Sequence, residues 1–229
     1  MLYSFFLLFA LDHTLLDFEV GEEVALGLLL EEMNFSDHEA FRAYYKPMNQ
    51  AMWKDLEKKL ITKSELVNTR FSKAFAYFGI EVDSPTMAEK FQGYMGQQGH
   101  AFAGAAELLK DLTNQGYQIY GATNGITKIQ QGRMQNSPIG PYFTQVFISE
   151  QLGTQKPDAL FYEKIAEQIE DFQHEEALMI GDSLTADIPG GIAAGLKTVW
   201  VNFKGQQNQT PYQADYEVRT YQELLHLLS

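Results

Sequence analysis

The feature that most constrains the fold is an alternation of short apolar runs and amphipathic segments in the second half of the chain. From Phe102 onward, the runs QIYGAT, QVFIS, EEALMIGD and TVWVNF are separated by helical patterns. Strands that alternate with helices of about ten to fifteen residues form parallel βαβ units. The sequence therefore predicts an α/β fold with a doubly wound parallel sheet.

The first residues add one more apolar run, LYSFFLLFALD. No Lys or Arg precedes Arg42, and the run is too short to span a bilayer, so it is interpreted as a buried strand and not as a signal peptide. This strand has to pair with the later ones. Residues 17–98 lie between them and carry only helical signals.

The helical signals of this block are capping patterns. SDHE (36–39) and TKSE (62–65) both match the capping box, and Ser84-Pro85 places a proline in a first turn. We expect an α/β core domain of residues 1–16 and 99–229, with a helical domain of residues 17–98 inserted after the first strand.

Composition excludes several classes of function. A formal charge of −13 argues against a nucleic-acid partner, because no basic stripe exists to neutralise phosphates. It does not exclude a small phosphorylated ligand. The absence of cysteine excludes disulfides, thiolate catalysis and cysteine-type zinc sites, and it fits a protein of the cytosol.

Polar residues follow the strands at their carboxyl ends, where open parallel sheets bind ligands. Each one alone has an ordinary explanation, as a turn, a helix cap or a solvated lysine. Their joint occurrence at one edge of a sheet is much harder to obtain by chance. The residues concerned are Asp12, Thr123, Asn124, Lys156, Asp182 and Asp187.

The order of these elements resembles the haloacid dehalogenase-like (HAD) hydrolases. Their four motifs are DxDxT, a strand-end Ser or Thr, a Lys and an acidic GDxxxxD; this chain has FALDHTLLDF, ATNG, QKPD and GDSLTAD. The details TLLDF, QKPD, and TNG followed by Gln130 and Arg133 are most similar to bacterial pyrimidine 5′-nucleotidases. The resemblance covers the full chain and implies that the helical insert is a cap.

The resemblance also implies roles for the strand-end residues. Asp12 would be the general acid/base, with its backbone carbonyl facing a magnesium ion. Asp182 would be a direct ligand of the Mg²⁺, and Asp187 a ligand or a neighbour that orients one. Thr123, Asn124 and Lys156 would hold the phosphoryl oxygens of the substrate.

Ala10 occupies the position of the nucleophilic aspartate. It stands two residues before Asp12, and we expect both to point to the same side of an extended strand. Neither Asp12 nor Asp17 is a persuasive replacement nucleophile. Three explanations stay open: an engineered knockout of an active phosphatase, a natural pseudoenzyme, or a sequence error. The chain as written is predicted to have negligible phosphatase turnover.

In the helical insert, Tyr45, Asn49 and Trp53 share one helix face. The pattern is similar to the cap of the nucleotidases, which implies contact with a nucleoside; packing within a bundle is the alternative. The expected partner is a small phosphorylated metabolite, a nucleoside monophosphate, with no nucleic acid and no membrane. The alternatives are a pseudoenzyme that binds a nucleotide or protein, a dehalogenase and a phosphomutase. The sequence does not determine the oligomeric state.

Overall fold

The computed structural model describes residues 5–228 and divides the chain into two compact units. One unit, called here the α/β unit, comprises the chain up to Phe18 and from Gly99 onward. The other, called the helical unit, comprises Glu19–Gln98. The helical segment is therefore an insertion into the α/β unit.

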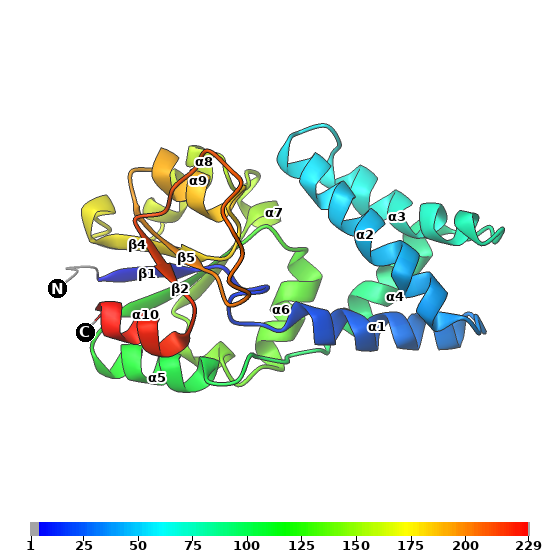
Figure 1. Ribbon diagram of the computed structural model, residues 1–229, viewed down its shortest axis with the longest axis horizontal. Coiled ribbons are helices and arrows are strands. Elements are labelled where there is room, and N and C mark those ends of the chain that lie inside the picture. Colours follow the sequence, from blue (N-terminus) through cyan, green and yellow to red (C-terminus); the bar gives the residue numbers. More distant parts are fainter. Residues whose placement is uncertain (1–4, 229) are drawn as a thin grey trace. The chain divides into compact units, whose positions relative to one another are not determined.

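The α/β unit is built on a six-stranded sheet in the order β3-β2-β1-β4-β5-β6, and every neighbouring pair is parallel (Figure 1). The fold class predicted from the sequence is confirmed. The strands are β1 (Phe6–Phe9), β2 (Gln118–Thr123), β3 (Gln145–Ile148), β4 (Ala177–Gly181), β5 (Lys197–Val201) and β6 (Tyr216–Val218).

Helices cover both faces of this sheet. Alternate residues of β1 separate into two cores: Leu7 and Phe9 pack with α5 and α10, while Phe6 and Leu8 pack with α8. This sorting explains why the strands are apolar throughout. The helices are α5 (Ala105–Asn114), α6 (Thr127–Gln135), α7 (Ser149–Leu152), α8 (Ala159–Ala166), α9 (Asp187–Ala193) and α10 (Tyr221–Leu228), with 3₁₀ turns η1 (Gly140–Tyr142) and η2 (His174–Glu176).

The end of β1 differs from the prediction. The strand stops at Phe9, although the Ala10 amide still donates to the Ile180 carbonyl at 2.8 Å. The chain then turns, because the Leu11 carbonyl accepts bonds from the amides of both Leu15 and Leu16. The alternation of the strand continues beyond Phe9, since Ala10 packs in the same core as Phe6 and Leu8, and Leu11 in the same core as Leu7 and Phe9. That Ala10 and Asp12 point to the same side stays a prediction.

The helical unit contains α1 (Phe18–Glu32, whose first residue belongs to the α/β unit), α2 (His38–Glu57), α3 (Lys63–Tyr77) and α4 (Ser84–Gly96). TKSE forms the predicted capping box, with Thr62 and Glu65 bonded reciprocally. SDHE does not. The cap of α2 is Asp37, whose carboxylate accepts from the Ala40 amide at 3.0 Å, one residue later than predicted.

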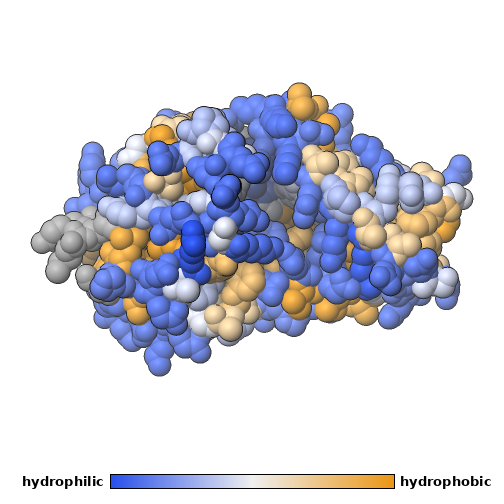
Figure 2. Space-filling view, in the orientation of Figure 1, coloured by the Kyte–Doolittle hydropathy of each residue, from blue (hydrophilic) through white to orange (hydrophobic). Residues whose placement is uncertain are grey.

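Hydrophilic residues dominate the surface shown in Figure 2, and apolar residues form separate patches. Among residues 5–228, no helix is long and apolar enough to cross a membrane.

Candidate active site

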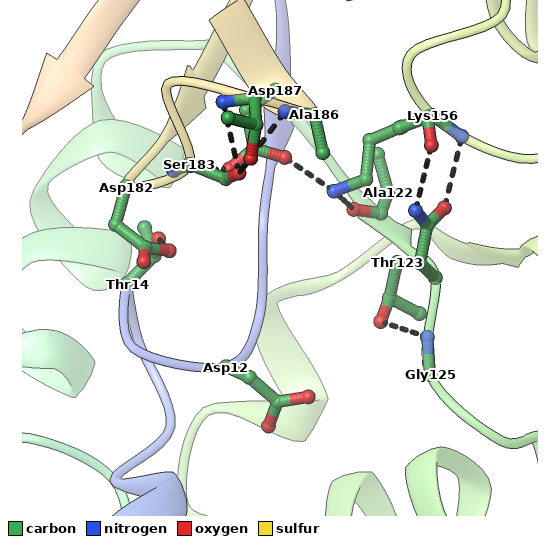
Figure 3. Close-up of polar contacts among 12 residues, drawn as sticks. Asp12, Thr14, Ala122, Thr123, Gly125, Lys156, Asp182, Ser183, Ala186 and Asp187 are labelled. Atoms are coloured by element: carbon green, nitrogen blue, oxygen red, sulfur yellow. Dashed lines mark hydrogen bonds and ion pairs between the residues drawn. The ribbon is translucent and has the colours of Figure 1, made fainter. Parts of the chain in front are cut away.

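The polar residues predicted at the strand ends come together in the α/β unit. The loop after β1, the end of β2, the loop that follows α7 and the loop after β4 all reach the same edge of the sheet (Figure 3). β1 lies between β2 and β4, so the segment that carries Ala10 and Asp12 is at the centre of this edge.

Lys156 and Asp187 form a buried ion pair. The ammonium group donates to Asp187 Oδ1 at 2.5 Å and to the Ala122 carbonyl at 2.7 Å, and both side chains are almost fully buried. The second oxygen of Asp187 accepts from the Ser183 amide at 2.9 Å. Gly181 makes room for this carboxylate, because a Cβ atom there would lie 2.2 Å from Asp187 Oδ2. Lys156 is thus fixed in place with one ammonium hydrogen left for a further acceptor.

Thr123 and Asn124 differ in what their side chains do. The Thr123 hydroxyl accepts from the Gly125 amide at 3.0 Å and from Gln130 Nε2 at 2.9 Å, which leaves its own hydrogen for a third partner. The Asn124 side chain instead forms two 2.9 Å bonds with the backbone of Lys156. Thr123 is therefore placed to donate to a ligand, while the Asn124 side chain fixes the loop that carries Lys156.

Asp182 lies on the other side of the site (Figure 3). Its Oδ1 accepts from the Thr14 hydroxyl at 3.0 Å, and its backbone carbonyl accepts from the Trp200 indole at 3.1 Å. Burial of the carboxyl, with the nearby charge of Asp187, raises the pKa of Asp182 to about 6, against the pull of His13, Thr14 and Lys156. Sequence reasoning did not identify Thr14 and Trp200 as neighbours of this carboxylate.

Asp12 points away from the Thr14–Asp182 pair (Figure 3). Its Oδ2 accepts from Gln130 Nε2 at 2.7 Å, and its Oδ1 forms an ion pair with Arg133 Nη1. Both partners come from α6 and are fully buried. The sequence singled out Gln130 and Arg133 only through a resemblance, and gave neither a role.

The polar atoms at this edge include carboxylate oxygens, which are the type of ligand that magnesium prefers. Asp182 carries a carboxyl whose pKa is raised partly by a second negative charge, so a cation at this point would relieve the repulsion. The methyl group of Ala10, which is buried, supplies no oxygen. Among residues 5–228, no three acidic or histidine side chains gather as metal ligands. This edge of the sheet thus has one carboxylate fewer than the resemblance implies for a magnesium site.

Tyr45, Asn49 and Trp53 lie in the helical unit. Tyr45 is fully buried and stacks between Phe41 and Phe71, with ring centroids at 5.8 and 5.5 Å. Asn49 is also buried and donates to Glu22. Trp53 is partly exposed and packs beside Met52, Leu56 and Leu66. Each of the three therefore has a packing role within its own unit.

The fold and the site define a hydrolase of the α/β class with an inserted helical unit. The family model for haloacid dehalogenase-like hydrolases matches residues 7–201, and the chain belongs to this family. The pyrimidine 5′-nucleotidase PynA of Streptococcus pneumoniae is 57% identical over 97% of this chain and 94% of its own. The pyrimidine 5′-nucleotidase YjjG of Escherichia coli is 29% identical over 80% of each chain.

Solved structures give the same result for the fold. The magnesium-bound crystal structure of YfnB from Bacillus subtilis superposes with a TM-score of 0.93, at 38% identity and 99% coverage of both chains. The L-2-haloacid dehalogenase of Xanthobacter autotrophicus superposes with a TM-score of 0.77 at 16% identity. The latter is a likeness of fold alone.

Proposed function

We propose that this site is of the HAD phosphatase type, built to cleave the phosphate ester of a nucleoside 5′-monophosphate. The observation that carries the proposal is the convergence of Thr123, Lys156, Asp182 and Asp12 at one sheet edge. The likeness to PynA over nearly the whole chain supports a pyrimidine nucleotide as the substrate.

The contacts in the site support a proposed task for each group. The free hydrogens of Thr123 and Lys156 bind the phosphoryl oxygens. Asp187 holds the Lys156 ammonium in position. Asp12 supplies a proton to the departing ribose oxygen as the ester P–O bond breaks, and later takes a proton from the water that attacks phosphorus. A nucleophilic carboxylate at position 10 would carry the phosphoryl group between these two steps.

A magnesium ion would be held by the Asp182 carboxylate and the backbone carbonyl of Asp12. When bound, it supplies positive charge that stabilises the phosphoryl group. We propose weaker magnesium affinity for this chain than for a chain with aspartate at position 10, since an anionic ligand is missing.

Ala10 removes the attacking atom. We propose that this chain binds the nucleotide but does not form an aspartyl-phosphate. Phosphate affinity is expected to be as high or higher, because a carboxylate that would repel the phosphate is absent. We also propose that the helical unit serves as the cap that selects the leaving group, with Asn49 and Trp53 as candidate contacts.

The test is to assay the chain and its Ala10→Asp variant with magnesium on uridine 5′-monophosphate and p-nitrophenyl phosphate. We expect no turnover by the unmodified chain and turnover at rates typical of enzymes, about 1–10³ s⁻¹, by the variant. Strong turnover by the unmodified chain would refute the role of position 10.

The same assay separates the alternatives. A variant that stays silent, together with a specific protein partner, would favour a non-catalytic binding protein. Turnover of 2-haloacids by the variant without magnesium would favour a dehalogenase.

A further inference from the structure

Helix α6 contacts the acid/base residue and the phosphate-binding residue at the same time. Gln130 Nε2 donates one hydrogen to Asp12 Oδ2 at 2.7 Å and the other to Thr123 Oγ1 at 2.9 Å. One amide group thus joins a side chain from the loop after β1 to a side chain at the end of β2.

Arg133 fixes the other oxygen of the same carboxylate. It is one turn further along α6 and pairs with Asp12 Oδ1. Its own position is fixed as well, since Nη2 donates to the Asp17 carbonyl at 3.4 Å and the guanidinium lies 5.8 Å from the centre of the Phe18 ring. The Arg133 side chain has no exposed surface, whereas that of Asp12 is 26% exposed, so a buried cation holds a carboxylate that still reaches the solvent-accessible edge.

Gly125 supports the same conclusion. A Cβ atom at this position would lie 2.4 Å from Gln130 Nε2 and 2.7 Å from its Cγ. The glycine that follows Thr123 and Asn124 therefore admits the Gln130 side chain to the site. The local sequence from β2 to α6 is arranged around this contact.

We propose that Gln130 and Arg133 are positioning residues. They hold the Asp12 carboxyl at a fixed distance from the Thr123 hydroxyl, so that the proton donor and the phosphate-binding group keep their relative positions. The proposal rests on the proposed function. This proposal has a specific chemical consequence. Protonation by a general acid matters most when the leaving group is strongly basic, as is the ribose oxygen of a nucleotide. p-Nitrophenolate leaves without that help.

The test uses the full-length Ala10→Asp chain with magnesium and adds Gln130→Met, Arg133→Lys or Gln131→Met. Gln131 is the matched control, because it is the exposed neighbour of Gln130 on the same helix. The measured quantity is kcat/KM for uridine 5′-monophosphate and for p-nitrophenyl phosphate, which reports the steps up to release of the leaving group. Circular dichroism melts confirm that each variant is folded.

We expect Gln130→Met and Arg133→Lys to lower kcat/KM for the nucleotide by about 10- to 100-fold, part of the 10²–10⁴ that general acid catalysis supplies, and for p-nitrophenyl phosphate by less than about threefold. Gln131→Met should change neither. Equal losses on both substrates, or no loss on the nucleotide, would overturn the positioning role alone. An Ala10→Asp chain without turnover of either substrate would overturn the proposed function and this inference with it.

Discussion

The α/β unit and the helical unit bury their charged side chains in different ways. In the α/β unit, Lys156 and Arg133 each meet a carboxylate, that of Asp187 and that of Asp12. In the helical unit, the buried Arg70 lies 5.1 and 4.9 Å from the ring centres of Phe71 and Phe91, and its Nε and Nη2 have no hydrogen-bond partner. The first arrangement fixes polar atoms at defined positions, and the second packs a cation among aromatic rings.

The two units also differ in how complete their polar contacts are. In the helical unit, the buried Tyr45 hydroxyl and Asn49 Oδ1 lack hydrogen-bond partners, and burial raises the pKa of Tyr45. In the α/β unit, the side chains of Lys156, Asp187 and Thr123 all have partners, and among residues 5–228 the buried atom of this unit without one is Gln130 Oε1. Complete hydrogen bonding makes geometry specific. The buried side chains of Lys156, Asp187 and Thr123 are therefore held by polar contacts, whereas Tyr45 and Arg70 of the helical unit are held mainly by aromatic packing.

The largest effect is expected from Lys156→Met. It leaves the Asp187 carboxylate buried without its cation, and breaking such a pair from one side costs about 3–5 kcal/mol in the free energy of unfolding. Urea unfolding monitored by Trp200 fluorescence in a Trp53→Phe background measures the α/β unit alone. Lys110→Met is the control, because Lys110 is exposed, and it should change stability by less than about 0.5 kcal/mol. A loss no larger than that of the control would remove the contrast between the units.

Asp182→Asn is expected to raise the free energy of unfolding, by less than Lys156→Met lowers it. The pKa of Asp182 is about 6 in the folded chain against an ordinary 3.8, so the folded state binds more protons between these values and stability falls as pH rises. Without magnesium, the variant should be more stable than the parent above pH 6, by on the order of 1 kcal/mol, and equal to it below pH 4. Thermal melts across this range measure the difference.

The same variant tests the metal site. Magnesium should raise the melting temperature of the parent chain and leave that of Asp182→Asn unchanged, because binding to the folded state alone stabilises it. An equal magnesium response in both chains would show that Asp182 is not a ligand.

Arg70→Met is expected to change the free energy of unfolding least. The cation–π contacts contribute about 0.5–2 kcal/mol, and the cost of burying unpaired guanidinium nitrogens offsets much of this. We expect a change within about 1 kcal/mol, measured through Trp53 fluorescence in a Trp200→Phe background. A loss comparable to that of Lys156→Met would show that the two units depend equally on their buried cations.

Much of this structure could be predicted from the sequence because it depends on local pattern. Short apolar runs and helical patterns indicated the strands and the helices between them, and the topology of parallel sheets predicted that Thr123, Lys156 and Asp182 lie at one edge. These predictions needed no knowledge of how one side chain meets another.

The contacts that could not be predicted depend on tertiary packing. The bond from Gln130 to Asp12 joins residues 118 positions apart. The Asn124 side chain accepts a hydrogen bond from the Lys156 amide, which lies 32 positions further along the chain. Such partners are chosen by packing distances, which a single sequence does not contain.

The two crossings between the units have a further consequence. Leu16 and Ala101 form an antiparallel bridge, and the Asp17 amide donates to the His100 carbonyl at 2.9 Å. The chain thus leaves and re-enters the α/β unit through hydrogen-bonded neighbours, so a short hairpin turn would be enough to join them. The helical segment is in this sense a replaceable insertion: a segment of another length could join the same two neighbouring points without a change in the sheet.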